Sequence, residues 1–144
     1  MRKNAYLGLI LASIMLSLNC SAAEADVVAV VSAKNPACML SRQQVTDIFL
    51  GKTARLPNGA IAVPIDQPDG SAERNEFYSR FADKSEAQIR AYWASLVFTG
   101  RGRPPQEAQD DADMKVLLVN DPNAIGYIER DKVDDRVKIC SKPK

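Results

Sequence analysis

The turn that begins at Asp66 and leads into Ser71 is the stretch of the chain best suited to bind a ligand. Pro68 fixes φ, Gly70 is free to adopt positive φ, and Ser71 is a typical helix N-cap. A helix N-terminus presents unpaired backbone N–H groups and the positive end of the helix dipole, which together can bind an anion. Gly70, Ser71 and Ala72 are therefore a candidate anion site. A capped connection without a ligand is the alternative interpretation.

The elements on either side of this turn must hold it in place. Ile61, Val63 and Ile65 alternate with smaller residues, which is the period of a strand. After Ser71, two phenylalanines four residues apart predict the apolar face of a helix. The centre of the fold is thus expected to be a strand, a polar turn and a helix.

Further strands and helices are expected along the rest of the chain. The β-branched run 27–31 predicts a strand buried on both faces, as in a parallel sheet. Helices should follow Ser41 and Ser85, because each serine precedes a glutamine at capping-box spacing. A further helix is expected near 110–120, and short strands at 124–128 and 137–140. This order, β-α-β-α-α-α-β-β, favours an α/β layered domain.

Two groups of residues in these helices are expected to be structural. Trp93 and Tyr92 lie on the apolar stripe of the helix after Ser85 and should belong to the core. Asp110, Asp111 and Asp113 lie where a helix begins, so their charge compensates the helix dipole and does not indicate a metal cluster.

The composition excludes most kinds of catalytic site. The chain contains no histidine, which removes Ser-His and Cys-His nucleophile pairs and most zinc sites. It has neither a nucleotide-hydrolase phosphate loop nor a dinucleotide glycine fingerprint. We therefore expect a protein that is not an enzyme and that uses no cofactor or metal.

The loop from Thr99 to Pro105 carries two further candidate ligand-binding residues. Its sequence, TGRGRPP, is incompatible with regular structure. Arg101 and Arg103 could offer guanidinium groups to phosphate-like oxygens if the loop folds over the Gly70 turn. A solvated loop is the alternative.

The N-terminal segment has the layout of a secretory signal peptide. Two basic residues precede an apolar run from Ala5 to Leu18, which is shorter than the roughly 20 residues that span a bilayer. Cleavage after Ala25 gives a signal peptide, 1–25, and a mature domain, 26–144, in the periplasm. Lipidation at Cys20 is the alternative.

The mature domain would retain Cys38 and Cys140. An even number of cysteines in an exported chain predicts a disulfide, which would close a long loop and stabilise the fold by roughly 4–5 kcal/mol. Two buried thiols are the alternative. Removing the signal peptide leaves equal numbers of basic and acidic residues, which argues against a nucleic-acid partner.

Several segments together resemble a known family, the periplasmic phosphate-binding proteins of ABC transporters, and especially their short single-lobe relatives. The resemblance extends over nearly all of the mature chain in the family's order, and the segments that carry it are VVAVVSAKNP, LSRQQVTDIFLGK, IAVPIDQPDGSAERNEFY and AIGYI. The resemblance implies one lobe of a type-2 periplasmic-binding-protein fold, with a mixed sheet flanked by helices.

The resemblance also implies a small oxyanion such as phosphate as the ligand, but two positions depart from the family pattern. Asp69, Gly70 and Ser71 match the family's anion-binding run, whereas Gln67 replaces its binding arginine. Glu73 replaces a threonine, and its carboxylate would repel a dianion.

We therefore expect an exported, non-catalytic solute-binding-like protein that is related to phosphate binding for ABC transport. The alternative is a periplasmic interaction or accessory module that has lost anion binding. Its partner would be a second copy of the chain or a membrane transporter or receptor component.

Overall fold

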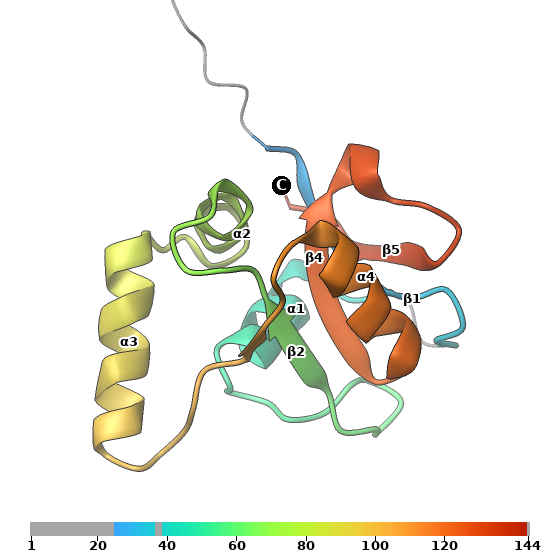
Figure 1. Ribbon diagram of the computed structural model, residues 1–144. Helices are drawn as coiled ribbons and strands as arrows, with labels where there is room; N and C mark the ends of the chain where they lie inside the picture. The colour runs from blue at the N-terminus through green and yellow to red at the C-terminus, as the bar shows by residue number, and fades with distance from the viewer. Residues whose placement is uncertain (1–24, 37–38, 144) are drawn as a thin grey trace, which may run out of the picture.

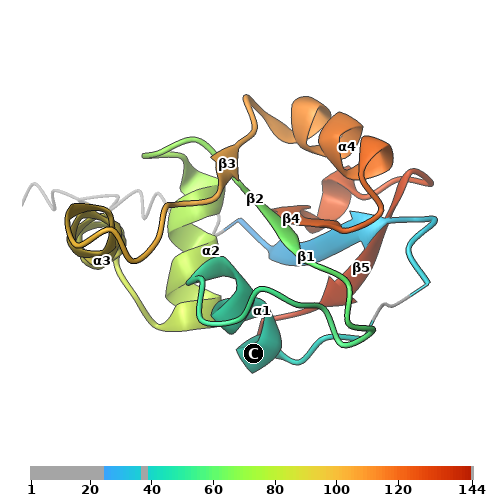
Figure 2. The ribbon, with the colours of Figure 1, turned by 90° about the horizontal axis from the view of Figure 1, so that it is seen from below.

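The computed structural model describes residues 25–36 and 39–143. The predicted signal peptide up to position 24, including Cys20, and the predicted disulfide partner Cys38 lie outside the described residues. The described chain is an α/β domain whose mixed sheet has helices on both faces, as expected (Figures 1 and 2).

The described elements follow the predicted order with two additions, a two-residue strand between the third and fourth helices and a short 3₁₀ helix before the last strand. In chain order they are β1 (Val27–Ser32), α1 (Arg42–Phe49), β2 (Val63–Asp66), α2 (Ala72–Ala82), α3 (Glu86–Phe98), β3 (Gln106–Glu107), α4 (Asp111–Asn120), β4 (Ala124–Glu129), the 3₁₀ helix η1 (Arg130–Lys132) and β5 (Val137–Ser141). The sequence missed β3 because two residues are too few to show a strand period.

The sheet has the strand order β3-β2-β4-β1-β5. β2 runs parallel to β3 and β4, whereas β1 is antiparallel to both of its neighbours, β4 and β5. All six residues of β1 are buried, which confirms the predicted burial on both faces. The prediction that this run pairs in a parallel sheet is wrong, because β1 is antiparallel to both neighbours. Helices cover both faces of the sheet, so a central strand is buried on both sides and must be apolar, whether it runs parallel or antiparallel to its neighbours.

Two hydrophobic cores lie on opposite faces of the sheet. Ala29 and Val31 of β1 point to the larger core, which contains α1, α2 and the inner side of α3. Val28 and Val30 point to the smaller core beneath α4. This alternation is the period-two geometry of a strand, so one strand serves both cores.

The predicted capping boxes are present at both sites. The Ser41 hydroxyl accepts from the Gln44 amide at 3.1 Å, and the Gln44 side chain accepts from the Ser41 amide at 2.8 Å. Ser85 and Gln88 form the same pair of bonds at the start of α3, at 3.3 and 2.8 Å. These bonds satisfy N–H groups that a helix leaves open, so local sequence fixes where both helices begin.

α3 lies beside α2 at the periphery of the molecule, away from the centre of the sheet (Figures 1 and 2). Trp93 is buried in the larger core, and Tyr92 is half-buried against it, so the prediction that both are core residues is confirmed. The last turn of α3 extends beyond this contact, and Phe98 is 92% exposed. Among the described helices, none has both the length and the apolar character that a membrane span requires.

Cys140 is buried in β5, and its carbonyl accepts a hydrogen bond from the Leu40 amide at 3.0 Å. The chain two residues after Cys38 is therefore held against the strand that contains Cys140. The predicted disulfide stays a prediction, since one of its cysteines lies outside the described residues.

Candidate functional site

Two helix N-termini frame a cavity of about 450 Å³. The turn before α2 contributes one wall and the first turn of α4 contributes the other, while two lysines complete the lining. The lining includes Gln67, Ser71, Glu73, Asp111, Lys115 and Lys132. Because both helices direct their N-termini to one space, the positive ends of two helix dipoles act on the same volume.

The α2 wall is built as the sequence predicts. Gly70 has φ of 82°, a conformation that favours glycine. Ser71 caps α2, and its hydroxyl oxygen accepts a hydrogen bond from the Arg74 amide at 3.2 Å. The amides of Ala72 and Glu73 lie in the first turn, where a helix provides no internal acceptor. The Ser71 hydroxyl proton and these two amides are donors suited to an oxyanion.

A buried polar cluster around Asp66, at the end of β2, supports this turn. The Asp66 carboxylate accepts hydrogen bonds from the hydroxyls of Tyr78, at 2.7 Å, and Tyr127. It also accepts from the Gln67 amide at 3.0 Å and pairs with the Arg74 guanidinium at 3.3 Å. Burial, and then the negative charge of Asp66, raise the pKa of both tyrosines well above the ordinary value. The two phenols therefore act as neutral donors that fix the end of β2.

Gln67 stands where the resemblance implies an arginine, and its buried side chain links neighbouring elements. Its Nε2 donates to Asp111 Oδ1 at 2.7 Å and to the Tyr127 carbonyl at 3.0 Å. These bonds join the turn to the start of α4 and to β4. The side chain thus provides structural contacts at a position where the resemblance implies a ligand-binding cation.

The charges around the cavity are mixed. Burial raises the pKa of Asp111, the Gln67 hydrogen bond lowers it, and the negative charge of Glu73 raises it further, with a net increase. Lys115 donates to Asp134 at 2.9 Å and to the Lys132 carbonyl at 2.8 Å, so Asp134 balances much of its charge. The α4 side of the cavity is consequently richer in negative charge than a dianion site should be.

An arginine that the sequence did not single out connects α3 to this turn. Arg90 donates to the Asp69 carboxylate at 3.1 Å, and Arg74 pairs with the same carboxylate from the other side. Asp69 is thus held between two guanidinium groups, one on α2 and one on α3. No local pattern identifies this contact, since Arg90 is 21 residues beyond Asp69.

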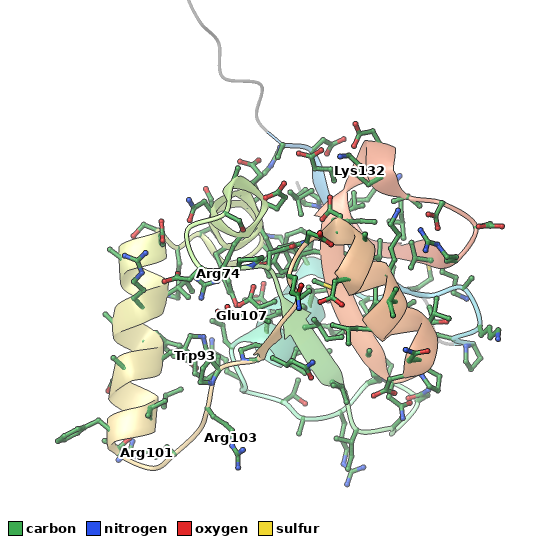
Figure 3. All side chains as sticks on the ribbon, viewed as in Figure 1. Arg74, Trp93, Arg101, Arg103, Glu107 and Lys132 are labelled. Atoms are coloured by element: carbon green, nitrogen blue, oxygen red, sulfur yellow. The ribbon has the colours of Figure 1, made fainter. Side chains whose placement is uncertain are left out.

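The structure does not bring the loop arginines to the cavity. Figure 3 shows Arg101 and Arg103 at the C-terminal end of α3, far from Lys132 and from Arg74 on α2. Arg103 lines a separate hollow of about 280 Å³ together with Trp93 and Pro104. Of the predicted ligand-binding residues, Gly70, Ser71 and Ala72 stay together at the start of α2, and the two arginines are separate from them.

Comparisons with solved structures identify proteins of the same fold. A phosphate ABC transporter substrate-binding protein from Clostridium perfringens, solved with bound phosphate, matches with a TM-score of 0.63, 25% identity and coverage of 79% of this chain. An ABC-type phosphate transport receptor from Vibrio cholerae matches with a TM-score of 0.62, 20% identity and 79% coverage. PstS from Borrelia burgdorferi matches with a TM-score of 0.60, 14% identity and 81% coverage.

The chain spans less than half of each of these structures, namely 43%, 44% and 46% of their lengths. No protein-family model matches the chain, and no curated protein matches its sequence. The predicted resemblance to the phosphate-binding substrate-binding proteins is confirmed by these structural matches, as is the predicted single α/β lobe.

Proposed function

We propose that this chain is an exported, non-catalytic lobe that binds a small oxyanion-bearing solute for an ABC transport system. The observation that carries the proposal is the convergence of the α2 and α4 N-termini on one cavity. The Ser71 hydroxyl and the first amides of α2 supply the oxyanion donors there. The structural similarity to a phosphate ABC transporter substrate-binding protein and to an ABC-type phosphate transport receptor supports the assignment.

Export to the periplasm is part of this proposal. It rests on the signal-peptide layout of residues 1–25, which would leave 26–144 as the mature domain. Transport receptors for solutes such as phosphate also match the fold. N-terminal sequencing of the secreted protein tests the cleavage site, and recovery of a lipid-modified Cys20 would contradict it.

A melting experiment tests anion binding. For the protein recovered after export, inorganic phosphate at about 100 times its dissociation constant should stabilise the fold by roughly 2.7 kcal/mol. Sulfate serves as a second anion. A melting temperature that does not change with millimolar phosphate, sulfate or related anions would contradict the proposal.

A matched pair of cap variants assigns that binding to the α2 terminus. Aspartate is a good N-cap, so Ser71→Asp should preserve the helix while placing a negative charge where the anion binds. We expect a normal melting temperature and loss of the phosphate response. Ser85→Asp makes the same change at the start of α3 and should retain the response. Equal responses in the two variants would place the anion elsewhere.

A second candidate function is protein interaction, and the exposed end of α3 favours it. Phe98 is 92% exposed and the neighbouring Val97 is 54% exposed, and such apolar surface is typical of interaction sites. A second copy of the chain or a transporter component would bind there. Small-angle scattering of the wild type and of Phe98→Ser tests this candidate. A monomeric wild type, without capture of a transporter component, would oppose it.

A further inference from the structure

The carboxylates beside the cavity oppose a simple dianion as its ligand. Burial raises the pKa of Asp111 and of Glu129, and the negative charge of Glu73 raises both further. These three carboxylates therefore repel one another. A dianion bound at the α2 N-terminus would add to that repulsion, because Glu73 lies in the first turn of the same helix.

The lysines compensate only part of this charge. Lys115 is already paired with Asp134 and with a backbone carbonyl. Lys132 lines the cavity and is exposed (Figure 3). The lining contains three acidic side chains, Glu73, Asp110 and Asp111, against these two lysines.

Gln67 offers the cavity a hydrogen-bond acceptor that no described residue uses. Its side chain lines the cavity and the residue is only 2% exposed. Both partners of Nε2 are acceptor oxygens, the Asp111 carboxylate and the Tyr127 carbonyl, so the orientation of the amide is fixed. The opposite end, Oε1, accepts no hydrogen bond from any described residue. This oxygen is reachable from the cavity, so a donor group of a bound ligand can bond to it.

The cavity thus offers oxyanion donors at α2 and cation acceptors at Gln67, Glu73 and Asp111. A metal ion does not fit these acceptors, because no group of three or more His, Cys, Asp or Glu side chains in the described residues could hold one. The volume of about 450 Å³ is also typical of a pocket for an organic ligand.

Building on the proposed oxyanion site, we infer that the ligand is a small zwitterion with a phosphate-like group and a protonated amine. The phosphate-like group binds the Ser71 hydroxyl and the first amides of α2. The ammonium group donates to Gln67 Oε1 and lies against the carboxylates of Glu73 and Asp111. The positive charge of the ammonium group offsets the repulsion between the phosphate-like group and these carboxylates. The carboxylates therefore favour a ligand with an amine over a simple dianion.

Calorimetry with three probes tests this inference on the protein recovered after export. Phosphoethanolamine carries both groups, inorganic phosphate carries only the anion, and ethanolamine carries only the cation. We expect phosphoethanolamine to bind about tenfold tighter than phosphate, as one charge-assisted contact provides, and ethanolamine to bind more weakly than either.

A carboxylate variant provides the matched test. Glu73→Gln should tighten phosphate binding and reduce the preference for phosphoethanolamine. Glu76→Gln, on the same helix but paired with Arg80, should leave the preference unchanged. Melting temperatures of both variants verify that they fold.

The outcomes separate this inference from the proposed function. Phosphate binding as tightly as phosphoethanolamine, or a preference that Glu73→Gln does not change, overturns the zwitterion and retains the oxyanion site. No binding of either phosphate or phosphoethanolamine overturns both.

Discussion

Asp66 is the side chain on which the polar contacts beneath the cavity converge. It is 1% exposed, yet four donors satisfy it: two phenols, one amide and the Arg74 guanidinium. A buried carboxylate is tolerated only when its hydrogen bonds and its charge are both matched. Asp66 therefore holds the end of β2 and the start of α2 in one geometry.

Asp66→Asn should destabilise the fold by about 3 kcal/mol, because it removes one member of a buried ion pair and leaves the buried Arg74 charge with only the half-exposed Asp69 as its partner. Urea unfolding measures the change. Asp83→Asn is the control: Asp83 pairs with Arg42 at the surface with its side chain 82% exposed, and φ of 53° suits asparagine. This control should lose less than about 1 kcal/mol. Equal losses in the two variants would contradict the role given to Asp66.

Asp111 should make stability depend on pH. Because its pKa in the folded protein is raised, the folded state binds the proton more tightly than the unfolded state does. Ionised Asp111 thus destabilises the fold at neutral pH, and this effect disappears as the pH falls through the raised pKa to below the ordinary value.

We expect the stability of Asp111→Asn relative to the wild type to be greatest near pH 7 and to decrease by about pH 4. Urea unfolding of both proteins across this range measures the difference in their free energies of unfolding. The other carboxylates titrate in both proteins, so their contribution cancels in this difference. A difference that is constant, or that increases toward acid, would contradict the raised pKa.

At the scale of elements, α4 is placed by its close approach to β4. Gly126 lies opposite Met114, and an added Cβ would be 2.3 Å from the sulfur of that side chain. Met114 is fully buried in the smaller core. Glycine at this point of β4 leaves room for the buried Met114 side chain, which would have to shift for any larger residue.

Gly126→Ala should therefore destabilise the protein by about 1–3 kcal/mol through overpacking. Combining it with Met114→Ala should recover part of that loss, because the shorter side chain makes room for the new methyl group. Denaturant unfolding of both single variants and of the double variant gives the coupling. Strictly additive losses would indicate that the two residues do not compete for space.

At the scale of the whole molecule, one sheet carries two cores and holds the cavity at their margin. α4 covers one face of the sheet, and α1 and α2 cover the other (Figure 2). The cavity lies where α2 and α4 begin, so its two walls belong to opposite layers. A ligand there would contact both layers, which is how binding could stabilise the domain as a unit.

The predicted disulfide would join the two ends of the mature chain. Leu40 is already bonded to the backbone of Cys140. We expect the exported protein to weigh about two daltons less than its reduced form, and its melting temperature to fall on reduction. Mass spectrometry before and after reduction checks this prediction. Two thiols that alkylate without reduction would contradict it.

The sequence by itself determined the local features of this protein. Ser41, Ser71 and Ser85 begin helices as predicted, because a cap bonds to amides only two or three residues away. The continuous apolar, β-branched run of β1 also predicted its burial on both faces. The α/β class follows from these local elements in order.

Only the tertiary structure decided which distant groups meet. It made β1 antiparallel to its neighbours, placed Asp111 beside Gln67, and brought Arg90 to Asp69. It also separated Arg103 from the turn that sequence reasoning had paired with it. These contacts depend on how helices pack across a sheet, which no short sequence pattern encodes. The Gly70–Ser71 turn was therefore predictable as a capped helix start, whereas the charges around its cavity were not.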